Sequence, residues 1–101
     1  MIIVLASIRV KSGKVADYLA ILKTVVPDVR NEKGCIEYIP TVDLDSKMPP
    51  QVLEREVVTI LEKWASLGEL QAHLVSAHML DYREKVKDLI EKVTIKVLQE
   101  A

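Results

Sequence analysis

The chain has 101 residues, and its 14 basic and 15 acidic side chains give a formal charge of −1. Its length predicts a single domain spanning residues 1–101, with half of the residues apolar and able to form a core. The charged residues are scattered along the sequence. A nucleic-acid-binding surface needs clustered basic side chains, so no nucleic-acid partner is expected.

The N-terminal segment and the cysteine content bear on location. The segment "MIIVLASIRV" is apolar, but it lacks a basic region and a small-residue cleavage site and is too short to cross a bilayer. Cys35 is the single cysteine, so it cannot form an internal disulfide and does not make a metal site. We therefore expect a cytoplasmic protein with no membrane partner.

Residues 2–10 and 15–29 show the clearest patterns. The first segment is β-branched and apolar at both odd and even positions, which is typical of a strand covered on both faces. In the second, apolar residues recur every three or four positions, which predicts a helix. Pro27 should kink its last turns, and Gly34 can adopt the left-handed conformation that follows a helix end.

The remaining elements are read from turn and capping signals. Strands are predicted over residues 35–42, where Pro40 indicates an edge or a bulge, and over residues 54–64. Ser66 and Glu69 have the spacing of a capping box that begins a short helix, and a second helical piece begins near Ser76. A last strand covers residues 92–99. The order β-α-β-β-α-β predicts the α+β, ferredoxin-like fold with an antiparallel sheet.

The sheet should have one face that the helices cannot cover. Two helical segments shield one face, yet both faces of the first and third strands carry aliphatic residues. Burying such a side chain is worth about 1.5–3 kcal/mol, so leaving about six exposed would forgo much of a domain's stability. We therefore predict a homodimer in which the two sheets pack on each other.

Few residues carry recognisable chemistry. There is no glycine-rich phosphate loop or nucleophile elbow, and the absence of Phe argues against an RNA-recognition sheet. His73 is either a buried histidine bonded to a backbone carbonyl or a polar group facing a pocket, and His78 is either a capping or surface residue or part of the same site. Their five-residue spacing does not place them on one helix face, so no metal site is expected.

The segments "NEKGCIEYIPTVD" and "ILEKWASLGELQAHLVSAHMLDY" resemble the antibiotic biosynthesis monooxygenase family, and in particular its bacterial quinol monooxygenase branch. The resemblance is carried by the "GC…Y" turn, by Glu62 and Trp64, and by the histidines in "AH" and "SAHM". It implies a dimeric α+β barrel. Haem-degrading relatives have Asn, Trp and His at three places that appear here as Ser7, His73 and Arg83, so haem degradation is disfavoured.

The resemblance implies a monooxygenase that uses O₂ on a quinol or another hydroxylated aromatic, without a metal or flavin cofactor. A phenol with a pKa of about 10 must lose its proton to a histidine of about 6.5, a gap worth roughly 5 kcal/mol. A dry pocket with a specific donor or cation would help to close it. His73 is the expected base or orienting donor, beside a second catalytic residue, Trp64. The expected substrate-binding residues are Ser7, Tyr38, Arg55, Glu62, His78, Tyr82 and Arg83, with Trp64 and Tyr38 as pocket walls.

Two other functions remain open from the sequence. One is an isomerase or lyase acting on a small, phosphorylated metabolite, although the scattered Lys and Arg residues give it no clear support. The other is a non-catalytic, dimeric module for ligand binding or stress response. Binding of a quinone without oxygen consumption would favour the second.

Overall fold

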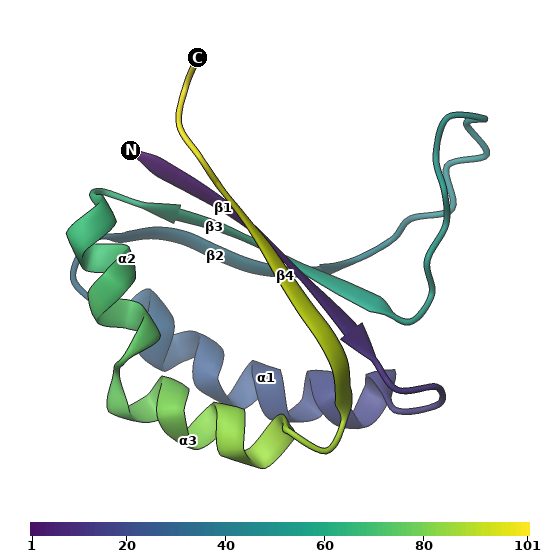
Figure 1. Ribbon diagram of the computed structural model, residues 1–101, viewed down its shortest axis with the longest axis horizontal. Coiled ribbons are helices and arrows are strands. Elements are labelled where there is room, and N and C mark those ends of the chain that lie inside the picture. The colour runs from purple at the N-terminus through teal and green to yellow at the C-terminus, as the bar shows by residue number, and fades with distance from the viewer.

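The computed structural model describes residues 1–101. Its elements are β1 (Ile2–Val10), α1 (Val15–Arg30), β2 (Cys35–Val42), β3 (Val57–Trp64), α2 (Leu67–Leu74), α3 (Ala77–Val86) and β4 (Ile90–Leu98). The strands form one antiparallel sheet in the order β2-β3-β1-β4, and the helices lie on one face of it (Figure 1). The predicted ferredoxin-like α+β fold is confirmed.

Element boundaries differ from the prediction at two strands. β3 begins at Val57 rather than at residue 54, because Arg55 and Glu56 occupy a turn before it. β4 begins at Ile90, two residues earlier than predicted, and its pairing with β1 is irregular between Arg9 and Val10. The second helical segment is divided into α2 and α3, as the Ser66 and Ser76 signals indicated.

The core lies between the helices and the even-numbered face of β1. Side chains of a strand alternate between its two faces, so this face receives Val4, Ala6, Ile8 and Val10, which are all at most 5% exposed. The apolar stripe of α1 packs against it through Tyr18, Leu22, Val25, Val26 and Val29. Even-numbered residues of β3, including Glu62 and Trp64, face the same side.

The helix ends follow the local signals in part. Ser66 caps α2 by accepting the Glu69 N–H with its Oγ at 3.3 Å, but Glu69 makes no hydrogen bond back to Ser66, so the predicted capping box is half formed. α1 ends at Arg30, and Gly34 has a φ of +82° in the turn that follows. A side chain at Gly34 would also collide with the Glu69 carboxylate, so both the backbone conformation and the available space require glycine at this position.

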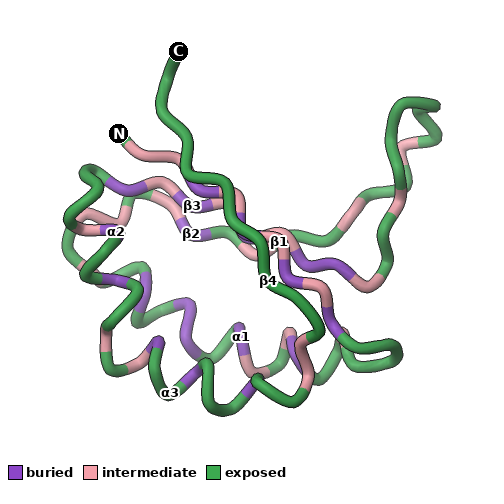
Figure 2. Tube along the Cα trace, viewed as in Figure 1, coloured by how far each residue is buried: buried purple, intermediate pink, exposed green.

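β4 is the uncovered strand of the sheet. Its residues Val93, Ile95 and Val97 pair with Ile8, Ala6 and Val4 of β1 and therefore share the helix-side face, yet they are 47–53% exposed. The helices cover β1, β2 and β3 and stop short of β4, which is exposed along most of its length (Figure 2). The apolar surface left open is thus concentrated on this edge strand.

The opposite face of the sheet is mixed rather than wholly apolar. Ile3, Leu5 and Leu61 make it aliphatic towards one end and are half-buried. A polar row crosses its middle, where Ser7 pairs with Thr59 on β3 and with Thr94 on β4. None of the three helices combines the length and the apolarity that a membrane span requires.

Candidate active site

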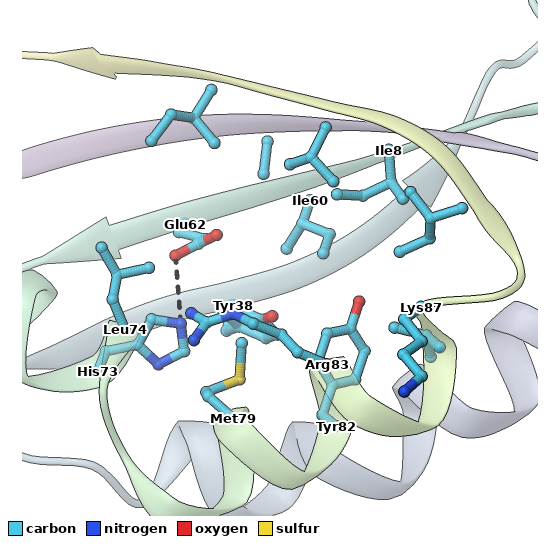
Figure 3. Close-up of a pocket in the computed structure, with 15 residues that line it drawn as sticks. Ile8, Tyr38, Ile60, Glu62, His73, Leu74, Met79, Tyr82, Arg83 and Lys87 are labelled. Carbon is cyan, nitrogen blue, oxygen red and sulfur yellow. Dashed lines mark ion pairs between the residues drawn. The ribbon is translucent and has the colours of Figure 1, made fainter.

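A cavity of about 420 Å³ lies between the helix-side face of the sheet and the helices α2 and α3. Of its 15 lining residues, 11 are hydrophobic, and Figure 3 shows them facing inward from both layers. Its aliphatic walls come from residues such as Ala6, Ile8, Ile60, Met79 and Val86. This size falls within the usual range for a small-molecule site, and the lining suits a flat apolar ligand.

Two buried titratable side chains, Glu62 and His73, form the polar end of the cavity. Glu62 is 5% exposed and His73 is 1% exposed. Glu62 Oε1 lies 3.9 Å from His73 Nε2 (Figure 3). A buried pair of titratable side chains in an apolar cavity is a common feature of active sites, because a bound ligand changes the protonation of both groups.

Trp64 holds this pair from behind. Its Nε1–H donates to Glu62 Oε1 at 3.0 Å, which is possible because residues two apart on a strand share a face. Its ring also packs on the His73 ring, with centroids 4.6 Å apart and planes inclined by 34°. Trp64 is fully buried and is not among the residues that line the cavity. The structure therefore makes it a support for Glu62 and His73 rather than the expected wall.

Burial dominates the ionisation of both groups. It raises the pKa of Glu62, while the Trp64 hydrogen bond acts in the opposite direction and the charge of Glu32 adds to the rise. Burial lowers the pKa of His73, against the effect of its hydrogen bond to Glu32. His73 is therefore held in its neutral form, in which one ring nitrogen can accept a proton.

The second ring nitrogen of His73 belongs to a separate cluster. His73 Nδ1 lies 2.7 Å from Glu32 Oε2, and His78 Nε2 lies 2.9 Å from the same oxygen. Glu32 comes from the turn after α1, His73 from the last turn of α2, and His78 from the first turn of α3. A carboxylate can only accept, so Nδ1 of His73 carries the proton and Nε2 presents its lone pair towards the cavity.

The three side chains place their donor atoms within 4.8 Å of one another, which is close enough for a cation to be considered. Ligand atoms around a tetrahedral zinc ion, each about 2.0–2.2 Å from it, lie roughly 3.3 Å apart. The observed contacts of 2.7 and 2.9 Å are shorter and match charge-assisted hydrogen bonds. The geometry thus favours a hydrogen-bonded chain over a metal centre.

Two tyrosines and two cations complete the cavity. Tyr38 meets the His73 ring edge-on, with centroids 5.7 Å apart, and its backbone carbonyl accepts from Arg30 at 3.0 and 3.2 Å. The Tyr82 hydroxyl shares a 2.5 Å hydrogen bond with that of Tyr18 beneath the helices. Arg83 and Lys87, both exposed, line the cavity from the α3 side (Figure 3).

The predicted site residues divide into two groups. Tyr38, Glu62, His73, Tyr82 and Arg83 all line the cavity. Four others do not: His78 is in contact with Glu32, Trp64 lies behind His73, Ser7 lies on the opposite face of the sheet, and Arg55 is exposed in the turn before β3. The structure thus gives no support to a direct substrate contact by these four.

Glu32 is the site residue that sequence reasoning missed. It is 41 residues from His73 and 46 from His78 along the chain, so no local spacing connects them. The five-residue interval between the histidines argued against a shared helix face, and they do lie on different helices. The break at Val75 and Ser76 nevertheless turns both rings towards the same carboxylate.

Comparison with known proteins agrees with the fold. Residues 1–85 match the model of the family described as antibiotic biosynthesis monooxygenase. The chain is 35% identical over 104 residues to the Escherichia coli (strain K12) protein named "Probable quinol monooxygenase YgiN", covering 98% of this chain and 97% of that protein. The chain therefore belongs to the antibiotic biosynthesis monooxygenase family.

Solved structures show the same fold. A conserved protein from Methanosarcina mazei Go1 superposes with a TM-score of 0.85 at 25% identity, covering 99% of this chain and 92% of that one. Protein SO0527 from Shewanella oneidensis superposes with a TM-score of 0.81 at 28% identity, covering 96% and 87%.

Proposed function

We propose that this protein is a monooxygenase that acts on a quinol or another hydroxylated aromatic, using O₂ and no metal or organic cofactor. Family membership supports monooxygenase chemistry in general, and the name of the Escherichia coli relative points to quinols. The observation that carries the proposal is the buried pair of His73 and Glu62 at one end of an otherwise apolar cavity. That arrangement suits a flat ring with one hydroxyl directed at the pair.

The substrate can supply every electron that the reaction needs. A naphthohydroquinol gains one oxygen atom at a ring C–H position and becomes a hydroxyquinone, while the other oxygen atom leaves as water. Oxidation of the ring and insertion of oxygen together provide the four electrons that O₂ accepts. The protein must therefore promote deprotonation, since the phenolate donates an electron to O₂ far more readily than the phenol.

His73 is the base in this proposal. Its Nε2 lone pair faces the cavity, and the Glu32 carboxylate fixes the tautomer from the other side of the ring. A histidine base is commonly oriented in this way, by a carboxylate that accepts a hydrogen bond from its other ring nitrogen. Arg83 at the rim would stabilise the phenolate that forms, because it supplies a permanent positive charge next to the cavity.

The lining weighs against a phosphorylated substrate. A phosphate site needs several convergent donors, whereas this cavity is lined mainly by hydrophobic side chains and its two cations are exposed at the rim. An isomerase or lyase of a phosphorylated metabolite is therefore the weaker proposal.

Oxygen consumption with reduced naphthoquinones tests the proposal. The wild-type protein should consume O₂ above the uncatalysed rate and form a hydroxyquinone, and His73→Ala should lower kcat by about 10²–10⁴-fold. Arg55→Ala serves as the matched control, because Arg55 lies outside the cavity. Stabilisation of the wild type by a quinone with no oxygen uptake would instead indicate a ligand-binding module.

We also propose that the protein works as a homodimer. The exposed aliphatic row of Val93, Ile95 and Val97 on β4 and the half-buried aliphatic end of the opposite sheet face are surfaces that a second copy would cover. Val93 and Ile95 also line the cavity, so a partner covering β4 would help to exclude water from it. Leu44, Met48 and Val52, in the loop that projects from the sheet in Figure 1, are exposed as well and offer the partner a further apolar contact.

A further inference from the structure

A line of polar side chains leads from the cavity wall to the surface of the protein. His73 faces the cavity with a side chain only 2% exposed, the Glu32 side chain is 14% exposed, and that of His78 is 27% exposed. The links between them are 2.7 Å from His73 Nδ1 to Glu32 Oε2 and 2.9 Å from that oxygen to His78 Nε2. Exposure thus rises at each step, and every step is a hydrogen bond.

The cavity itself offers no comparable outlet. Beyond Glu62 and His73 its polar lining consists of two tyrosine hydroxyls and the rim cations Arg83 and Lys87, which do not accept protons. A proton taken by His73 Nε2 would remain beside the positive charge of Arg83 in a buried site. The repulsion between these two positive charges falls when the proton on the far side of the ring, at Nδ1, moves to Glu32.

We propose that Glu32 and His78 form a proton relay in which Glu32 takes the Nδ1 proton of His73 out of the cavity and returns it later in the reaction, while His78 Nε2–H donates to Glu32 and holds it in place. This inference rests on the proposed function, because it concerns the proton that a quinol releases. Glu32 and His78 act through His73 and need not touch the substrate. Their task is to position that histidine and to hold a proton outside the apolar cavity.

The transfers balance without an external acid or base. The substrate O–H bond breaks as the Nε2–H bond of His73 forms, and the Nδ1–H bond of His73 breaks as its proton passes to Glu32 Oε2. His78 Nε2–H, which donates to that oxygen, keeps its proton and holds Glu32 in place while the neutral carboxyl stores the transferred proton. Reduction of O₂ to water consumes protons at the cavity end, so the same transfers run in reverse. His73 then recovers the tautomer with the proton on Nδ1, ready for the next substrate.

Ser76 supports the outer end of the relay. Its Oγ donates to the His73 carbonyl at 2.8 Å and lies 3.2 Å from His78 Nε2. The hydroxyl is therefore a fixed neighbour of the nitrogen that faces Glu32. This contact explains how two histidines on separate helices keep a common partner across the break between α2 and α3.

Steady-state kinetics with a naphthohydroquinol under air test the relay. His78→Ala should lower kcat by about tenfold or more while KM stays unchanged, because His78 lies outside the cavity. Imidazole added to the buffer should restore kcat, since its N–H can replace the missing donor to Glu32. Gln71→Ala, on the exposed side of α2, is the matched control and should behave as the wild type does.

Several kinetic outcomes would overturn the relay. An unchanged kcat in His78→Ala would do so, and so would a loss that comes with a raised KM and is not restored by imidazole, because that pattern indicates a structural role. Loss of wild-type activity on adding a chelator, with recovery on adding zinc, would show that the three side chains hold a metal ion instead.

Nitrogen NMR of the histidine rings gives a test that does not depend on activity. In the relay Glu32 accepts from Nδ1 of His73 and from Nε2 of His78, so the ring-nitrogen signals should show a proton on each of these atoms, and Glu32→Gln should shift the signals of both rings. Glu62 and Arg83 lie on the cavity side of His73 and are retained in this variant. A wild type in which either nitrogen lacks its proton, or in which Glu32→Gln leaves one ring unchanged, would refute the relay. A wild type that oxidises no quinol but shows both protons would refute only the proposed function.

Discussion

The two strands that flank β1 have similar aliphatic content and opposite environments. β3 is buried along its even-numbered positions, where it carries Trp64 and a carboxylate, Glu62. β4 carries Val93, Ile95 and Val97 at the corresponding positions, and these are about half exposed. The difference comes from what lies above each strand, because helices cover β3 and nothing in the chain covers β4. The covered strand can place a buried carboxylate next to the cavity, and the uncovered strand leaves its aliphatic side chains exposed.

The largest effect should follow from removing the ring that supports β3. Trp64→Ala should lower the free energy of unfolding by about 3–5 kcal/mol, because it leaves a cavity behind His73 and removes a donor from Glu62. Denaturation in urea measures this. Lys23→Ala, on the exposed side of α1, is the control and should change stability by no more than about 0.5 kcal/mol. Equal effects of the two substitutions would contradict the contrast between covered and uncovered regions.

Removing only the indole N–H should cost less. Trp64→Phe keeps most of the ring packing but leaves Glu62 Oε1 without its donor, which is expected to cost about 1–3 kcal/mol. The same variant should weaken catalysis as well, since Glu62 loses its fixed position beside His73. A variant as stable as the wild type would show that the hydrogen bond from Trp64 is not needed.

β4 offers the complementary test. Light scattering during size-exclusion chromatography should give about twice the 11.4 kDa chain mass for the wild type, and Ile95→Glu should give the single-chain mass at the same concentration. A charge at this position cannot be desolvated at low cost in an interface. A well-folded wild-type monomer at micromolar concentration would contradict the proposed dimer.

The pH dependence of stability should report on the buried histidine. Because burial lowers the pKa of His73 from 6.5, the unfolded chain binds this proton more readily than the folded one. The stability that this residue contributes is present above pH 6.5 and is lost as the pH falls towards the pKa of the folded state. His73→Gln should show a smaller loss over that range in urea denaturation, and a matching loss would contradict a neutral buried His73.

The smallest effect is expected at an exposed ion pair of the uncovered sheet face. Lys63 Nζ lies 3.3 Å from Glu37 Oε2, and both side chains are about one third exposed or more. Solvent screening limits such pairs to about 0–1 kcal/mol, so Glu37→Gln should be nearly neutral in the same denaturation experiment. A loss as large as that of Trp64→Phe would show that this face is more sensitive to substitution than its exposure implies.

Periodicity predicted the fold because it reflects which face of each element is buried. The stripe of α1 and the alternation of β3 identified the correct faces, including the shared side of Glu62 and Trp64. Sequence did not show where the helices stop, and that determines the exposure of β4. The position of Glu32 was also out of reach, because its contacts with His73 and His78 depend on how three helix ends meet.

A crystal structure with a bound quinone analogue tests the central claim most directly. We predict that the ring lies in the cavity between the sheet and α3, against Tyr38 and Ile60, with one oxygen within hydrogen-bond distance of His73 Nε2. An analogue bound instead on the opposite face of the sheet, beside Ser7 and Thr59, would contradict it.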